Sequence, residues 1–108
     1  MTFQEAFKEI REHFMQADVS RINEKIAVQI NLTGEGEGIF YAEIKDGYLS
    51  VEPYDYHDRD LLFIVDTKDF IKIASGKMSA EKAFLTKKLI IEGDLDKAMK
   101  INEILKQQ

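Results

Sequence analysis

The residues best suited to chemistry in this chain lie close together, where Asp55, His57, Asp58 and Asp60 share one polar stretch. Carboxylates and an imidazole could bind a hard cation or exchange protons with a substrate. A calcium-binding loop, however, needs a glycine at its sixth position and a glutamate at its twelfth, and this stretch does not have that pattern. We therefore interpret residues 54–60 as a solvated loop and predict no metal site. The same loop is where an enzyme would have its catalytic groups.

The other candidates for chemistry form no recognisable active site. His13 lies 44 residues from His57, beside the apolar stripe of a predicted helix. The glycine-rich stretch 34–38 connects two predicted strands and carries Glu35 and Glu37, which would repel a phosphate. Because there is no cysteine, disulfides, thiolate metal sites and a cysteine nucleophile are excluded. We predict no catalytic residue and no cofactor, and hence a protein that is not an enzyme.

Composition and charge narrow the class of partner. The chain has 108 residues, of which 44% are hydrophobic and 32% charged, and we predict one domain over residues 1–108. Its net charge of −5 argues against nucleic acid as a partner. Residues 1–54 hold 5 basic and 10 acidic side chains, whereas residues 67–108 hold 9 basic and 6 acidic ones. The basic end could contact an anionic membrane surface transiently, or its lysines could simply be solvated surface groups.

The sequence predicts no targeting or membrane-spanning segment. The first residues lack the basic region and apolar run of a signal peptide. No apolar run approaches the roughly 18 residues of a membrane-spanning helix. Residues 106–108 are not a peroxisomal address of the Ser-Lys-Leu type. Since the absence of cysteine also suits a reducing compartment, we expect a cytoplasmic protein.

The first half of the chain predicts one helix and three strands. Apolar residues recur every three or four positions from Phe3 to Ala17, which is typical of an amphipathic helix of about four turns. Residues 26–32, 40–44 and 48–52 alternate between apolar and polar side chains, as strands with one buried face do. Asp46-Gly47 is a strong two-residue hairpin signal. These strands therefore form an antiparallel meander.

The second half predicts two more strands and three helices. Residues 61–65 are apolar throughout, so we expect an interior strand covered on both faces. Thr67 and Ser79 are suitable N-caps for two short helices, which lead to a strand at residues 88–91. Asp94 caps a closing helix. Because all helices must bury a face on one sheet, the pattern predicts an α+β, two-layer fold.

The closing helix, residues 95–105, is unusually apolar. Its apolar side chains cover an arc of roughly 220°, whereas a helix lying on one core needs only a little over ~100°. We therefore expect this helix to contact something besides the core. The candidates are a ligand cavity, a partner subunit and a membrane.

The ordered set of local sequences resembles the sterol carrier protein-2 family, in its stand-alone bacterial type, and the resemblance covers about residues 3–106. The matching strings are residues 26–34, 45–47, 65–70 followed by 76–78, and Phe84 with 90–94 and 98–100. The resemblance implies a five-stranded, mostly antiparallel sheet with helices packed on one face. It also implies an apolar tunnel between sheet and helices that holds a sterol, a fatty acyl chain or another hydrophobic small molecule.

We predict that the tunnel wall is built by apolar residues of the last third of the chain. The candidate ligand-binding residues are Phe70, Ile73, Met78, Phe84, Met99, Ile101, Ile104 and Leu105. Each of them could instead be plain core. The predicted function is non-enzymatic lipid binding, with transfer as its extension. The alternative is an interaction module that forms a homodimer through the closing helix, which Ile104→Asp should dissociate.

A cavity has an energetic consequence for so small a protein. An empty pocket of ~300 Å³, at ~24 cal/mol per Å³, would cost about 7 kcal/mol. The whole domain is expected to be stable by only ~5–15 kcal/mol. The sequence therefore predicts a cavity that is occupied, partly collapsed or covered by a mobile closing helix.

Overall fold

The computed structural model describes residues 1–106. Gln107 and Gln108, which belong to the predicted 1–108 domain, lie outside the described residues. The elements in chain order are α1 (Phe3–Phe14), β1 (Ile26–Thr33), β2 (Gly38–Lys45), β3 (Tyr48–Glu52), β4 (Leu61–Asp66), α2 (Thr67–Ala74), α3 (Ala80–Leu85), β5 (Leu89–Gly93) and α4 (Leu95–Leu105). None of the helices within residues 1–106 has the length and hydropathy of a membrane-spanning segment.

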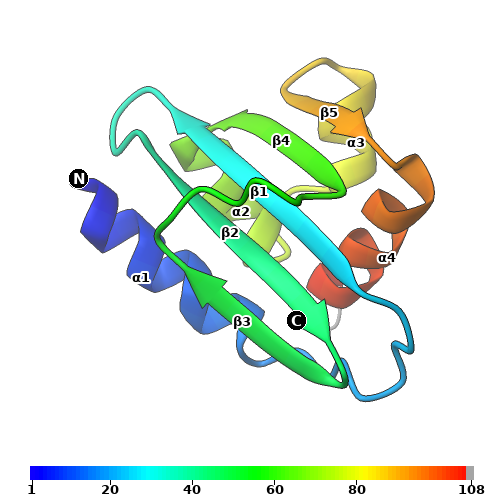
Figure 1. Cartoon of the computed structure of the whole chain (residues 1–108). Helices are drawn as coiled ribbons and strands as arrows, with labels where there is room; N and C mark the ends of the chain where they lie inside the picture. Colours follow the sequence, from blue (N-terminus) through cyan, green and yellow to red (C-terminus); the bar gives the residue numbers. More distant parts are fainter. Residues whose placement is uncertain (107–108) are drawn as a thin grey trace.

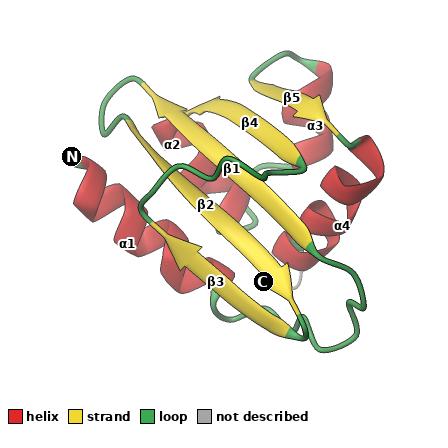
Figure 2. Cartoon of the chain, in the orientation of Figure 1, coloured by secondary structure: helices red, strands yellow, loops and turns green. Residues whose placement is uncertain are grey.

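The strands form one five-stranded sheet with the order β3-β2-β1-β4-β5. Within the part of the chain that the structure describes, only the pairing of β1 with β4 is parallel, and the other three pairings are antiparallel. All four helices pack on the same face of this sheet (Figures 1 and 2). The two-layer α+β fold and the mostly antiparallel sheet predicted from the sequence are thus confirmed.

The opposite face of the sheet is crossed by the chain itself. β3 is at one edge, whereas β4 lies on the far side of β1, so the connecting residues 53–60 must pass over β2 and β1. In Figure 1 this segment runs in front of both strands, on the face without helices. The polar loop predicted at residues 54–60 is this crossover.

The inner face and the helices share one aromatic-rich core. Phe14 of α1 stacks on Phe70 of α2 with ring centroids 6.3 Å apart, and Phe40 of β2 lies 6.1 Å from Phe70. Phe7 meets Phe40 edge-on at 5.3 Å. These contacts hold α1 and α2 over β2, which leaves α3 and α4 to cover the other end of the sheet.

Three local predictions are corrected by the structure. α1 ends at Phe14 and not at Ala17, and Ala17 packs against the core from the turn that follows. β4 is interior but not covered on both faces, because none of the described helices lies on the outer side and Ile64 is only half-buried there. The N-cap of α2 is Asp66, whose carboxylate accepts a hydrogen bond from Lys68 N, because β4 runs directly into the helix. Thr67 is instead buried and donates to the Thr33 carbonyl at 3.0 Å.

Asp60 fixes the junction where the crossover, β1 and α4 meet. Its backbone N–H donates to the Ala27 carbonyl at 2.7 Å, and its carboxylate accepts from the Ala27 N–H at 2.8 Å. The Asp60 carbonyl accepts from Asp94 N at 3.2 Å, and Lys97 Nζ lies 3.0 Å from Asp60 Oδ1. Gly93 allows this approach, because it has φ +111° and an added Cβ would lie 2.4 Å from the Asp60 carbonyl oxygen. The first turn of α4 is therefore held against the start of β4.

The junction predicts a pH-dependent contribution to stability. Burial acts to raise the pKa of Asp60, but the hydrogen bond from Ala27 and the Lys97 ammonium outweigh it and hold this pKa below its ordinary value. The ionised carboxylate thus stabilises the fold above the pKa of the unfolded chain, and the contribution is lost as pH falls through the folded-state pKa. Asp60→Asn should lower the free energy of unfolding by about 1–2 kcal/mol at neutral pH, measured by urea denaturation. The deficit should shrink on acidification.

Asp58→Asn is the matched control, because Asp58 is an exposed carboxylate in the same crossover. Its substitution should leave the free energy of unfolding unchanged at either pH. A deficit for Asp60→Asn that grows as the pH falls would contradict the role assigned to the charge.

Candidate ligand-binding site

The inner layer encloses a cavity of about 380 Å³ between α3, α4 and the β4–β5 end of the sheet. Its lining comes from strands and helices far apart in sequence: Phe63, Phe70, Ile73, Ala80, Glu81, Phe84, Leu85, Leu89, Ile91, Leu95, Ala98, Met99, Ile101, Asn102, Glu103 and Leu105. All but three of these residues are apolar. Such a lining offers an apolar molecule a place to bind but few groups for polar recognition.

The cavity has a buried floor and an exposed rim. Phe63, Phe70, Leu89 and Ile101 at the floor are almost inaccessible to solvent. The four apolar residues of the rim, by contrast, are between 41% and 77% exposed: Phe84, Leu85, Leu95 and Met99. The cavity is therefore open to solvent on the side where α3 faces α4.

Caps and buried alanines set the two helices that form the walls. Ser79 accepts a hydrogen bond from Lys82 N at 3.3 Å and Asp94 accepts one from Lys97 N at 3.2 Å, as predicted for N-caps. Ala98 of α4 is buried and lines the cavity. Because an alanine is small, space remains between α4 and the sheet that a larger side chain would fill.

One end of the cavity carries a polar cluster that bridges α3 and α4. Lys106 Nζ donates to Glu81 Oε1 at 3.0 Å, and Asn102 Nδ2 donates to the same oxygen at 3.1 Å. The hydrogen bond and positive charge of Lys106 hold the pKa of Glu81 below its usual value. Glu81 and Asn102 line the cavity, so this cluster is the polar group nearest to a bound molecule.

Six of the eight predicted wall residues line this cavity: Phe70, Ile73, Phe84, Met99, Ile101 and Leu105. Met78 lies next to it, in a hollow of about 250 Å³ that shares Ile73 and Leu105 with the main cavity. Ile104 does not face the cavity. It is buried and lines a separate hollow together with Asp18 and Ile22 of the loop after α1.

The wide apolar arc of α4 is thus divided between three environments. Ile104 packs toward the loop after α1, Ile101 and Leu105 line the cavity, and Leu95 and Met99 are exposed at the rim. Since Ile104 is buried within the chain, Ile104→Asp would disrupt the core and cannot serve as a test of dimerisation.

Several lining residues were missed by the sequence reasoning. Leu89 and Ile91 lie on the inner face of β5, and their alternation with exposed residues predicted that common face. Leu95 belonged to the apolar arc of the closing helix but was left out of the predicted wall. Ala98 belonged to the same arc and was also not among the predicted wall residues. Phe63 carried no local signal, because the floor of a cavity and the core of a protein are built from the same apolar residue types.

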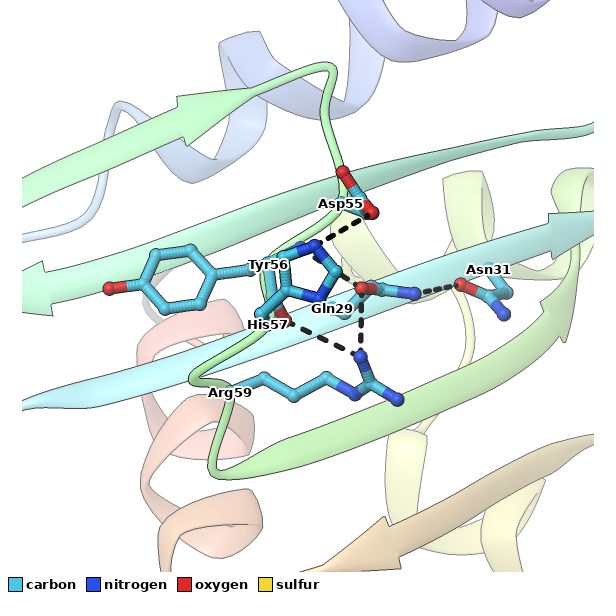
Figure 3. A network of polar contacts seen from close by, with 6 residues as sticks. All are labelled: Gln29, Asn31, Asp55, Tyr56, His57 and Arg59. Carbon is cyan, nitrogen blue, oxygen red and sulfur yellow. Dashed lines mark hydrogen bonds and ion pairs between the residues drawn. The ribbon is translucent and has the colours of Figure 1, made fainter.

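The polar loop lies on the opposite face of the sheet from the cavity. In Figure 3, Tyr56 and Arg59 approach Gln29 of β1, whose Oε1 accepts from Tyr56 N at 3.1 Å and from Arg59 Nη1 at 3.2 Å. Gln29 Nε2 in turn donates to Asn31 Oδ1 at 2.9 Å. Gln29 is buried under the crossover, so these polar groups hold the loop on the sheet.

His57 takes no part in that network. Its side chain is 93% exposed, and its nearest carboxylate oxygen, Asp55 Oδ2, lies 3.8 Å away. Within residues 1–106 no group of three histidines or carboxylates is close enough to hold a metal ion. Asp55, His57 and Asp58 are therefore separated from the cavity by the thickness of the sheet, whereas Asp60 contacts the first turn of α4 and has a structural role there.

Comparison with known proteins decides the family. The model of the SCP-2 sterol transfer family matches residues 3–106. The chain belongs to this family. The resemblance inferred from the sequence, including its extent along the chain, is thereby confirmed.

Individual members and structures agree with this assignment. Hydroxysteroid dehydrogenase-like protein 2 of Xenopus tropicalis is 34% identical over 105 residues, which make up 96% of this chain but 25% of that protein. The chain spans about a quarter of the length of the curated relatives it matches. The match covers only this part of the relative, so the activity in the relative's name is not assigned to this chain.

Two solved structures share the fold. Sterol Carrier Protein-2 like-3 from Aedes aegypti has a TM-score of 0.70 at 16% identity, covering 97% of each chain. The Aedes aegypti Sterol Carrier Protein-2, solved in complex with palmitate, has a TM-score of 0.64 at 16% identity over 97% of this chain and 94% of that chain. At such identities the likeness establishes the SCP-2 fold.

The network on the outer face gives a stability prediction. Gln29→Ala removes the oxygen that accepts from Tyr56 N and Arg59, and it should lower the free energy of unfolding by about 1–3 kcal/mol in urea denaturation. Gln4→Ala is the control, because Gln4 is exposed on α1. Equal stabilities of the two variants would show that the network does not hold the crossover in place.

Proposed function

We propose that this protein binds the apolar part of a lipid, an acyl chain or a sterol-like skeleton, in the cavity between α3, α4 and the sheet. One observation carries the proposal: an open cavity of about 380 Å³ in which 13 of the 16 lining residues are apolar. Its volume lies within the roughly 300–1,000 Å³ usual for small-molecule sites. The protein itself performs no chemistry on the ligand.

The energetics of such a site need no specific motif. Each methylene that leaves water contributes about 0.8 kcal/mol, so ~10 methylenes supply ~8 kcal/mol before entropic losses. The buried floor offers this contact through aromatic and aliphatic side chains such as Phe63, Phe70 and Leu89. Met99 at the rim adds a flexible thioether that adapts to differently shaped ligands.

Because the cavity is open to solvent, the folded protein does not bear the free-energy cost of an empty sealed void. A sealed cavity of this size would cost several kcal/mol, whereas an open one exposes apolar surface to water. A ligand chain that displaces this water would cover Phe84, Leu85 and Met99 at once. Occupancy should therefore stabilise the folded protein.

Two properties of related proteins support the proposal. The matching family is described as a sterol transfer family, and the Aedes aegypti protein of the same fold has been solved with palmitate. The alternative, a homodimer through α4, is less favoured. The side chains it would need, Ile101, Ile104 and Leu105, are already buried within the chain.

Filling the cavity tests the proposal. Ala98→Phe places an aromatic ring in the space between α4 and the sheet, so it should weaken binding of dansyl-undecanoic acid by at least about tenfold. The measurement is fluorescence titration of the probe, with displacement by palmitate and by hexadecanol. The free energy of unfolding should stay within about 1.5 kcal/mol, since the ring fills existing space.

Ser50→Phe is the matched control, because Ser50 is exposed on the outer face of β3. It adds the same ring away from the cavity and should leave probe binding unchanged. Failure of the wild-type protein to bind the probe, or equal binding by both variants, would refute a ligand site between α3 and α4.

A further inference from the structure

The polar residues of the cavity lining all lie at one end of it. Among the 16 described residues that line the cavity, they are Glu81, Asn102 and Glu103. Glu81 belongs to the first turn of α3, whereas the other two lie near the end of α4, seven and eight residues after Leu95 of the rim. That separation corresponds to roughly 10 Å along the helix axis. A lipid that lies along the cavity would therefore meet polar groups with only one of its ends.

The free hydrogen-bonding positions at this polar end are acceptors. Asn102 Nδ2 and Lys106 Nζ both donate to the same oxygen, Glu81 Oε1, at 3.1 and 3.0 Å. Within residues 1–106, no protein group donates to the second carboxylate oxygen, Glu81 Oε2, or to Asn102 Oδ1. A head group that donates a hydrogen bond would thus find two acceptors here.

The net charge at the polar end is negative. Glu81 and Glu103 each carry a carboxylate, and Lys106 supplies one ammonium, which lies 3.0 Å from Glu81 Oε1 and 4.0 Å from Glu103 Oε1. The three side chains together have a formal charge of −1. Both carboxylate residues line the cavity, whereas Lys106 lines the adjoining hollow. A negatively charged head group would therefore be repelled by the groups closest to it.

We propose that Glu81 and Asn102 form a head-group subsite for lipids whose head group donates hydrogen bonds and carries no negative charge, such as long-chain alcohols and amines. The head group would donate to Glu81 Oε2 and Asn102 Oδ1, while the hydrocarbon chain covers the apolar floor. This subsite rests on the proposed function, because it selects among lipids that the cavity already binds through their chains. A long-chain carboxylate would bind through its chain alone, and more weakly.

Competition among lipids of one chain length tests the proposal. Dodecanol, dodecylamine and dodecanoate are used to displace dansyl-undecanoic acid from the wild-type protein and from Glu81→Gln, and each affinity is corrected for the affinity of that protein for the probe. The substitution removes one negative charge but keeps an oxygen that can accept from Asn102 and Lys106. It should strengthen binding of dodecanoate by roughly fivefold and weaken binding of dodecylamine by a similar factor. The factors are modest because the Glu81 side chain is 65% exposed and solvent screens its charge. Dodecanol, which is uncharged, should change less than either.

Lys106→Gln should have the opposite effect on the same ratio of affinities. It removes the positive charge from the cluster, so it should weaken binding of dodecanoate and strengthen binding of dodecylamine, again by roughly fivefold. Glu9→Gln is the matched control, because Glu9 is exposed on α1 and does not line the cavity. It removes the same charge as Glu81→Gln and should leave all three affinities unchanged.

The outcomes separate this inference from the proposed function. A wild-type protein that binds dodecanoate more tightly than dodecylamine overturns the head-group subsite, as does an unchanged ratio of these affinities in both cluster variants. Parallel losses for all three lipids would show that Glu81 has only a structural role, and they overturn the subsite as well. In each of these cases displacement of the probe by the lipids would still support lipid binding in the cavity. A wild-type protein that binds no probe overturns both proposals.

Discussion

The carboxylate and backbone of Asp60 join the three segments that must meet before a cavity can exist. They hold β1 through Ala27, the start of β4 through the chain itself, and α4 through Asp94 and Lys97. α4 follows β5 after a single residue, so its direction depends on this junction and on Gly93. Without them the helix would have no fixed distance from the sheet, and that distance sets the width of the cavity.

The two faces of the sheet serve different purposes. On the outer face, Tyr56 and Arg59 donate hydrogen bonds to Gln29 and hold the crossover on the sheet. The polar groups on this face therefore have a structural role. On the inner face, the helices leave apolar surface incompletely covered beside Ala98. The residue types most often associated with catalysis are therefore the structural ones here, and the chemically inert residues form the site.

The sequence predicted local structure better than it predicted the roles of side chains. α4 was predicted at Leu95–Leu105 because Asp94 is a capping residue and the apolar period is clear. Ile101 and Ile104 show why the site was harder. Both are buried on the same helix, yet one lines the cavity and the other lines a separate hollow beside the loop after α1. That difference depends on which neighbour each side chain meets, and the path of residues 53–60 over the outer face likewise has no local signal.

The parallel pairing of β1 with β4 has a further consequence for folding. Among the described residues it is the only ladder that joins the β1–β3 meander to β4 and β5, and it pairs residues more than 30 positions apart, such as Val28 with Leu61. Local hairpins close quickly, whereas such distant pairings come late because loop closure costs entropy. We therefore expect the meander to form first and the half that carries the cavity to assemble on it. The same division would let the cavity half loosen and exchange its amide protons while the meander stays folded.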